Sequence, residues 1–229
     1  MRFDIITIFP EAFESYLSTS ILKRAQERGL IEVRLQSLRR WGRGRHRQLD
    51  DKPYGGGAGM VLMAEPILHA VKSLKLKIKG RSTKIIILSA KGKQFTQRMA
   101  RNWARRYERL ILISGRYEGI DERVRQILKA DEVSIGPYVL TDGDVAAMAV
   151  VSAVARLIPG VIRLESLAEE SHWSWLTKRE AVPGRKGLEY PHYTRPEVLR
   201  WKGRAYRAPK VLLSGNHREI ANWRSRHAR

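Results

Sequence analysis

Short apolar runs alternate with segments of helical periodicity through the first 157 residues of the chain. Runs typical of buried strands lie at residues 2–9, 31–37, 84–89, 110–114 and 131–136. Segments with apolar residues at helical spacing lie at residues 11–29, 64–74, 94–107, 121–128 and 144–157. Strands and helices in this alternation favour an α/β domain built on a mostly parallel sheet.

The alternation stops near Ile158, where Pro, Gly and mixed charges replace periodic apolar residues. We therefore expect an α/β domain over residues 1–159, a linker over 160–190, and a small helical region over 191–229. In the last part, the run VLLSG reads as a short strand or an apolar turn, and Asn216 is a candidate N-cap for a basic terminal helix.

The chain is strongly basic, with 44 Lys and Arg against 23 Asp and Glu and a formal net charge of +21. Such a surface attracts polyanions and makes nucleic acid the first partner to consider, although a basic surface without a specific partner gives the same total. The stretch RRWGRGRHR at 39–47 has the composition of a loop that contacts phosphates and stacks on bases, with a merely solvated basic loop as the alternative. Candidate RNA-binding residues are Arg43, Arg45 and Arg47 in this stretch and Arg195, His217 and Arg224 in the tail.

Several classes of site lack their sequence signatures. The absence of Cys excludes disulfides, thiolate zinc sites and cysteine nucleophiles, and the six His show no spacing of metal ligands. Neither a GxxxxGK[ST] phosphate loop nor a GxGxxG turn after a strand is present. The apolar run at the N-terminus is too short to span a membrane, so we expect a soluble, cytoplasmic protein with no metal centre and no membrane partner.

Glycine-bearing turns follow three of the expected strands: LSAKGK at 88–93, SGRYEGID at 114–121 and SIGPYVLTDGD at 134–144. Ligands of open α/β sheets bind outside the carboxyl ends of the strands, so three such turns suggest one shared pocket. Each turn alone is also compatible with ordinary left-handed glycine geometry. The string DDKPYGGGAGM at 50–60 favours a close backbone approach to a ligand or a hinge, with a flexible spacer as the alternative.

Candidates for acid–base chemistry lie close to the expected domain boundary. Glu169 and Glu170 carry carboxylates suited to proton abstraction, and Arg156, at the end of the last helix, can stabilise negative charge. A solvated acidic pair in a linker is the alternative interpretation, and residue types alone do not decide between the two.

These strings together resemble one family. DDKPYGGGAGMVL, ISGRYEGIDERV, SIGPYVLTDGD, AVARLIPGV, LEYPHYTRP and VLLSGNHREIANWR occur in the order found in the bacterial tRNA (guanine-N1)-methyltransferases, over residues 1–226. The resemblance implies a SPOUT-class α/β fold with a deep trefoil knot, a homodimer, and S-adenosylmethionine as cofactor, with a divalent cation such as magnesium as a further candidate. It also implies tRNA as the partner and N1 of the guanosine immediately 3′ of the anticodon as the methylated atom.

Carried over motif by motif, the resemblance implies a cofactor pocket built from the glycine-bearing turns. Its residues are Leu88, Ser89, Gly115, Tyr117, Glu118, Gly119, Ser134, Ile135, Gly136, Tyr138, Val139, Leu140 and Gly143. The resemblance further implies that Glu170, which stands where the family has Asp, removes the N1 proton. Arg156 would interact with guanine O6 and stabilise the charge that develops there.

The chain departs from the family pattern at several positions. Gly136-Pro137-Tyr138 and Asp142-Gly143-Asp144 replace Gly-Asp-Tyr and Gly-Gly-Glu, and LSAKG replaces LSPxG. The sequence ends before the string with which the family's C-terminal domain continues, so a shortened tRNA-binding region is expected. Two alternatives stay open, namely a SPOUT RNA methyltransferase with a different target nucleotide and a non-catalytic RNA-binding homologue.

Overall fold

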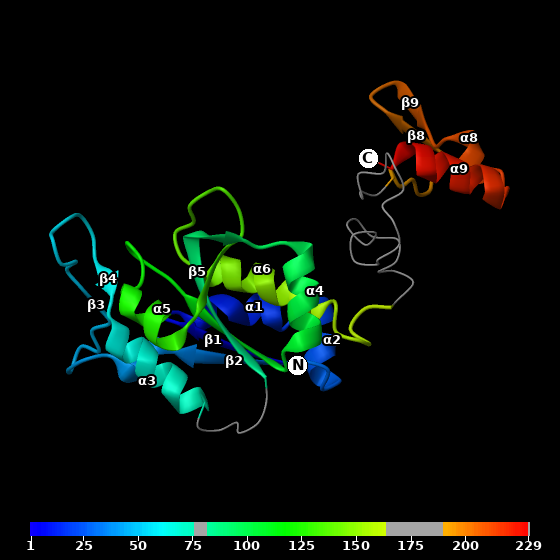
Figure 1. The fold of residues 1–229 in the computed structure, drawn as a ribbon. Helices are drawn as coiled ribbons and strands as arrows, with labels where there is room; N and C mark the ends of the chain where they lie inside the picture. The colour runs from blue at the N-terminus through cyan, green and yellow to red at the C-terminus, as the bar shows by residue number, and fades with distance from the viewer. Residues whose placement is uncertain (76–81, 164–189, 229) are drawn as a thin grey trace. The chain divides into compact units, whose positions relative to one another are not determined.

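The computed structural model describes residues 1–75, 82–163 and 190–228 (Figure 1). It comprises two compact units, Met1–Ile162 and Arg163–Arg229. The expected linker at 160–190 lies for the most part outside the described residues.

The first unit alternates strands and helices as the sequence pattern predicts. Its strands are β1 (Arg2–Thr7), β2 (Glu32–Ser37), β3 (Asp50–Asp51), β4 (Val61–Leu62), β5 (Thr83–Gln94), β6 (Arg109–Ser114) and β7 (Asp131–Ser134). Its helices are the 3-10 helices η1 (Pro10–Phe13) and η2 (Leu38–Trp41), and α1 (Glu14–Leu17), α2 (Ser20–Glu27), α3 (Ala64–Lys75), α4 (Gln97–Arg106), α5 (Glu122–Leu128) and α6 (Asp144–Ala155). Five strands form a parallel sheet in the order β2-β1-β6-β5-β7, which confirms the predicted α/β class.

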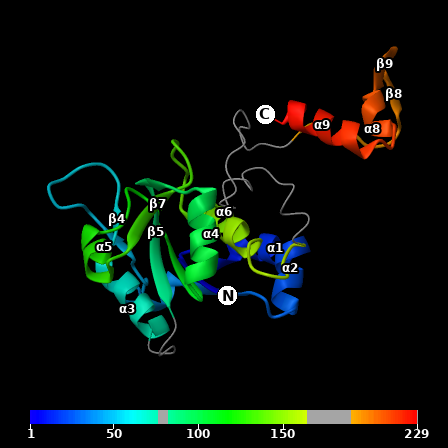
Figure 2. The same ribbon diagram turned by 45° about the vertical axis from the view of Figure 1, so that its right-hand side comes forward.

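Helices cover both faces of this sheet, and each face has its own apolar core. Phe3 and Ile5 of β1 pack in the cluster that contains residues of α1, α2, α4 and α6. Ile6 of β1, with Ile111 and Ile113 of β6, packs in the cluster that contains residues of α3 and α5. Figure 2 shows α3 and α5 on one side of β5 and α4 and α6 on the other. Because successive side chains of a strand face opposite ways, burial of both faces explains the nearly continuous apolar runs in the sequence.

A buried ion pair ties together the neighbouring strands β1 and β6. Arg109, at the start of β6, is 1% exposed and donates from Nε to Asp4 Oδ2 over 2.6 Å. Asp4 also accepts from Arg2 Nη2 over 2.7 Å, and Arg109 Nη1 donates to the carbonyl oxygen of Leu74 over 3.0 Å. Removing either partner would leave a desolvated charge, so this end of the sheet tolerates little substitution.

The segment after β1 differs from the prediction of one helix over 11–29. It forms η1, α1 and α2 in succession. Thr19 is extended, with φ −121° and ψ 153°, and Ser20 has a φ of 49°, so the helical path is interrupted between α1 and α2.

The turn expected at 88–93 is also different, because these residues belong to β5, which continues to Gln94. The pairing of β5 with β7 shifts register between Leu88 and Lys93, as in a β-bulge. Gly92 is needed at this point, since a Cβ there would lie 2.4 Å from the backbone nitrogen of Val133.

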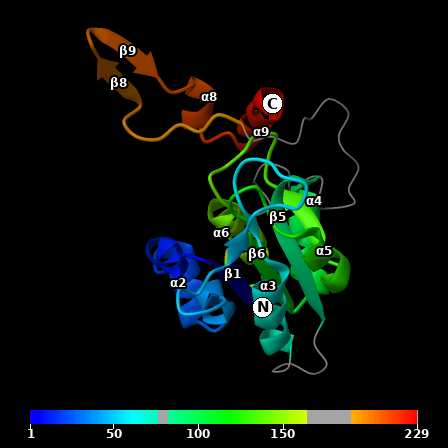
Figure 3. The same ribbon diagram turned by 90° about the vertical axis from the view of Figure 1, so that its left-hand side faces the viewer.

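The C-terminal unit is not purely helical, contrary to the sequence prediction. Its described residues form a hairpin of β8 (Val198–Trp201) and β9 (Arg204–Arg207), followed by α8 (Lys210–Leu213) and α9 (His217–His227) (Figure 3). The run VLLSG therefore belongs mainly to a short helix rather than to a strand or turn. The predicted cap is confirmed, because the side chain of Asn216 accepts a hydrogen bond from the backbone N–H of Glu219 over 3.3 Å.

Candidate active site

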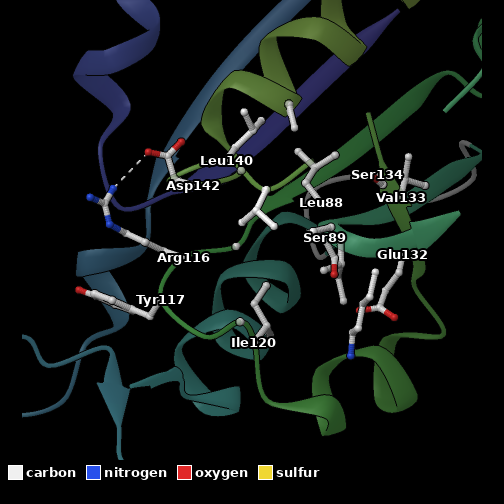
Figure 4. Close-up of a pocket in the computed structure, with 18 of the residues that line it drawn as sticks. Leu88, Ser89, Arg116, Tyr117, Ile120, Glu132, Val133, Ser134, Leu140 and Asp142 are labelled. Atoms are coloured by element: carbon white, nitrogen blue, oxygen red, sulfur yellow. Dashed lines mark hydrogen bonds and ion pairs between the residues drawn. The ribbon is translucent and has the colours of Figure 1, made fainter. Parts of the chain in front are cut away.

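A cavity of about 380 Å³ lies beside residues 87–91 of β5 and at the carboxyl ends of β6 and β7. Its lining comes from the later part of β5, from the turn after β6, and from the loop between β7 and α6 (Figure 4). The carboxyl ends of parallel strands meet at one edge of a sheet, so segments far apart in the sequence converge here. The shared pocket predicted from the three glycine-bearing segments is therefore present in the structure.

Nearly all the residues predicted to bind the cofactor lie around this cavity. They are Leu88, Ser89, Gly115, Tyr117, Glu118, Gly119, Ser134, Ile135, Tyr138, Val139, Leu140 and Gly143. Gly136 alone of the predicted set does not line it. Its backbone N–H donates to Ser134 Oγ over 3.2 Å and its carbonyl oxygen accepts from the same hydroxyl over 2.8 Å, so Gly136 shapes the loop that carries the lining residues.

The loop before α6 passes directly against the turn after β6. The backbone N–H of Gly143 donates to the carbonyl oxygen of Gly115 over 2.8 Å. A Cβ at Gly143 would lie 2.8 Å from the backbone nitrogen of Gly115 and 3.0 Å from Cα of Ser114. These neighbours are backbone atoms that have little freedom to move, so only glycine fits between the two segments.

The glycine-rich segment at 55–59 reaches the same turn. Glu118 donates its backbone N–H to the carbonyl oxygen of Met60 over 3.0 Å, and Leu62 donates to the carbonyl oxygen of Gly119 over 3.0 Å. Gly59 has a φ of +78°, and a Cβ there would lie 2.5 Å from Oε1 of Glu118. At Gly59 the backbone of this segment therefore lies against a residue of the cavity wall, and the predicted approach to a ligand or a hinge stays a prediction.

Sequence reasoning missed an ion pair at the cavity between Arg116 and Asp142, whose Nη1 and Oδ2 are 3.5 Å apart (Figure 4). The guanidinium of Arg116 also lies over the ring of Phe9, 4.6 Å from its centroid. A second oxygen of Asp142 accepts the backbone N–H of Asp144 over 3.0 Å. The only sequence signal for this cluster was the departure from the family pattern at Asp142-Gly143-Asp144.

Asp144, at the start of α6, is a buried carboxyl next to this pair. It is 5% exposed, and Thr7 Oγ1 donates to its Oδ1 over 2.8 Å. Burial raises the pKa of Asp144 above its ordinary value, the hydrogen bonds from Ser114 and Thr7 oppose that shift, and the charge of Asp142 adds to it. The folded protein therefore binds a proton at Asp144 more tightly than the unfolded chain does.

We expect the substitution Asp144→Asn to raise stability at neutral pH. Because the pKa is raised on folding, wild-type stability falls as the pH rises from the ordinary aspartate pKa through the raised one, and the whole penalty is present above the raised value. Asn carries no charge and can still accept from Thr7. Urea unfolding should show Asp144→Asn to be the more stable protein at pH 7, with the difference shrinking toward about pH 4. A variant less stable than wild type at pH 7 would mean that the network favours the charged carboxylate.

Comparison with known proteins gives the family. The family model described as tRNA (Guanine-1)-methyltransferase TrmD matches residues 1–229. The chain belongs to this family. The TrmD fingerprint thus covers both the cavity segments of the first unit and the hairpin and helices of the second.

Individual TrmD relatives match over most of their length. Proteins named tRNA (guanine-N(1)-)-methyltransferase from Thermomicrobium roseum and Chloroflexus aurantiacus are 55% and 53% identical to this chain, each over 98% of it, and the matches cover 77% and 82% of those proteins. The protein of that name from Carboxydothermus hydrogenoformans is 47% identical over 100% of this chain and 83% of its own length.

Of the two residues to which the TrmD resemblance gives catalytic roles, the structure describes only Arg156, which lies away from the cavity. Arg156 follows the last residue of α6, whereas Asp144, at the other end of the same helix, adjoins the cavity. A helix rises about 1.5 Å per residue, which separates Arg156 from that end by roughly 18 Å. Glu170, like Glu169, lies outside the described residues. The cavity and Arg156 of one chain therefore do not form a single site.

The candidate RNA-binding residues of this TrmD chain have different surroundings. Arg43 is paired with Glu65, to which its Nε donates over 3.0 Å, while Arg45 and Arg47 are exposed. Trp41, expected to stack on bases, is half-buried and packs against the core under α3. In the C-terminal unit Arg195 and His217 are exposed, and the guanidinium of Arg224 lies 4.9 Å from the ring centroid of Tyr190.

No group of three or more His, Asp or Glu side chains among the described residues is placed to hold a metal ion. Of the helices that the structure describes, none has both the length and the apolar character needed to cross a membrane.

Proposed function

We propose that this chain transfers a methyl group from S-adenosylmethionine to N1 of the guanosine immediately 3′ of the tRNA anticodon, and does so in the cytoplasm. The observation that carries the proposal is the convergence of three strand-end segments on one cavity in a chain that belongs to the TrmD family. The named relatives are tRNA (guanine-N(1)-)-methyltransferases, and the net charge of +21 suits a polyanionic substrate.

The cavity fits the proposed cofactor in size and in charge. Its volume of about 380 Å³ lies in the range of small-molecule sites. Although the chain is strongly basic, carboxylates outnumber cationic side chains in the cavity lining. The carboxylates are those of Glu118, Asp121, Glu122, Glu132 and Asp142, and the cations are Lys91, Arg116 and Arg125. S-adenosylmethionine supplies an activated methyl group on a positively charged sulfonium, and this acidic lining suits that charge. The apolar lining residues Leu88, Leu140 and Ala146 suit an adenine ring.

We also propose that the chain between β5 and α6 is tied in the deep trefoil knot of SPOUT enzymes. The support is the close crossing of the two loops, where Gly143 donates to Gly115 with no room for a side chain. Such threading is rare among proteins, and in this position it would hold the cavity segments together without a covalent link.

In the proposed mechanism Glu170 removes the N1 proton of the target guanine, and Arg156 neutralises the negative charge that develops on O6. The contribution of the cavity is to hold the cofactor in line with N1, since positioning supplies much of the rate of such a transfer. Because Arg156 is too far from the cavity of its own chain, we propose a homodimer in which each chain completes the site of the other.

The proposed function is tested with the full chain, labelled S-adenosylmethionine and an unmodified tRNA transcript that carries guanosine 3′ of the anticodon. We expect one methyl group per tRNA, located at N1 of that guanosine. A matched transcript with adenosine at this position should not be methylated. Methylation of another nucleotide would support the alternative of a changed target. Cofactor and tRNA binding without any methylation would support the alternative of a non-catalytic RNA-binding protein.

A further inference from the structure

The hairpin of the C-terminal unit carries an aromatic and cationic face that the proposed chemistry does not use. In the antiparallel register Leu199 lies opposite Tyr206, and Trp201 lies opposite Arg204. Residues directly opposite each other, and residues two apart on one strand, share a face of a hairpin. Leu199, Trp201, Arg204 and Tyr206 therefore form one surface, here called the hairpin face.

The apolar members of the hairpin face are open to solvent. Leu199 is 52% exposed, Trp201 62% and Tyr206 53%. No residue of β8 or β9 is buried, so the hairpin has no core beneath it in the part of the chain that the structure describes. An isolated two-stranded hairpin is marginally stable in water, and clustered exposed aromatic residues mark interaction surfaces.

The charge of the hairpin identifies the kind of partner. The ten residues from Val198 to Arg207 carry the cations Arg200, Lys202, Arg204 and Arg207 and no Asp or Glu. Lys202 sits at the tip, because Lys202 and Gly203 have φ values of 47° and 73°, as in a two-residue type I′ turn. Aromatic rings among cations with no acids are suited to a nucleic acid, whose phosphates and bases they contact together.

We propose that the hairpin face binds the tRNA substrate by stacking Trp201 and Tyr206 on unpaired bases, while the cations around it contact phosphates. This inference rests on the proposed function and adds to it a second contact with the same tRNA. Bases within an A-form stem do not present their ring faces, whereas bases of loops, bulges and ends do. The hairpin therefore binds unpaired nucleotides rather than a base-paired stem.

A second copy of this chain is the rival occupant of the hairpin face. In a symmetric dimer the same patch meets itself, which would bring eight cations together without an acid between them. Like charges placed opposite each other disfavour such an interface. Charge complementarity thus favours RNA over a second hairpin.

The test measures binding of the full chain to the unmodified tRNA transcript at several salt concentrations. Trp201→Leu should weaken binding about tenfold or more, because a base loses its stacking partner, and should leave the salt dependence unchanged. Trp201→Phe should keep most of the affinity, since it keeps an aromatic ring. Arg200→Gln, on the other face of the hairpin, should reduce the slope of log affinity against log salt by about one, as expected for a lost phosphate contact.

The matched control is Leu213→Ala, which removes an exposed apolar side chain of α8 outside the hairpin and should not change tRNA affinity.

The proposal is wrong if Trp201→Leu binds tRNA as wild type does, or if Trp201→Phe is as weak as Trp201→Leu. It is also wrong if Trp201→Leu lowers self-association in sedimentation, since the occupant is then a second copy. Methylation of the transcript by the wild-type protein separates a failure of the hairpin proposal from a failure of the proposed function. Unchanged binding by hairpin variants of an active enzyme refutes the hairpin proposal alone, whereas a wild type that does not bind tRNA refutes the proposed function.

Discussion

Replacing Gly143 by Ala should weaken the binding of S-adenosylmethionine by about 10- to 100-fold, the equivalent of about 1–3 kcal/mol of overpacking. The added Cβ would lie 2.8 Å from the backbone nitrogen of Gly115 and 3.0 Å from Cα of Ser114. Neither atom can move without displacing the end of β6. Because φ of Gly143 is −85°, Ala suffers no backbone strain, so the whole effect is steric. Isothermal titration with the cofactor measures the loss.

Gly136→Ala is the matched control in the same loop. A Cβ there would also be too close to a neighbour, 2.2 Å from Cε1 of Tyr138, but that neighbour is the end of a side chain that is 53% exposed and can turn away. We expect a much smaller loss of affinity than for Gly143→Ala. Equal losses in two folded variants would mean that any change in the loop disturbs binding, and that the crossing at Gly143 has no special role.

The second large effect is expected for Arg156→Ala, which should lower kcat by about 10²- to 10³-fold, as does removal of other groups that stabilise developing negative charge. Cofactor affinity should stay close to that of wild type, because the role proposed for Arg156 is a contact with guanine O6 and not with the cofactor. Arg156→Lys keeps the charge but not the planar fork of donors, and should retain an intermediate rate. A rate unchanged in Arg156→Ala would remove this residue from the mechanism.

Mixing the two variants tests whether two chains share a site. The cofactor concentration is set too low to fill the cavity of the Gly143→Ala variant. Each variant alone should then be nearly inactive, one because its cavity is empty and the other because it lacks Arg156. After exchange of subunits between equal amounts of the two variants, about half of the dimers are mixed. Each mixed dimer has one site in which both the cavity and Arg156 are intact, so about a quarter of the wild-type rate should return. No recovery despite verified exchange would place Arg156 and the cavity of the same chain in one site.

The sequence could predict the cavity because the signals for it are local. Buried strands and the glycines after them are visible in the residues, and parallel strands bring those glycines to one edge. The Arg116–Asp142 pair and the burial of Asp144 could not be predicted in the same way, because they depend on how the loop before α6 crosses the turn after β6. The packing of Trp41 could not be predicted for a related reason, since composition places it in a basic loop and only the tertiary structure shows the core beside it.

The hairpin at 198–207 was missed because both of its faces are exposed and polar residues interrupt any alternation. The pair Lys202-Gly203 was the available signal, as a glycine-bearing two-residue turn between segments with aromatic residues. Glu170 illustrates a different limit. Its role follows from family resemblance alone, because no spacing or periodicity of the residues around it singles out one carboxylate.

The buried pair of Asp4 and Arg109 lies toward the amino ends of β1 and β6, at the opposite edge of the sheet from the cavity. The amino edge of the sheet, which holds the buried ion pair, thus contributes to resistance to unfolding, whereas the carboxyl edge, which holds the cavity, sets chemical specificity. Laboratory evolution of cofactor preference can accordingly accumulate substitutions in the loops at the carboxyl edge while the anchoring edge keeps the scaffold intact. In libraries that randomise positions at both edges, most variants would misfold and could not be tested for binding of a new cofactor.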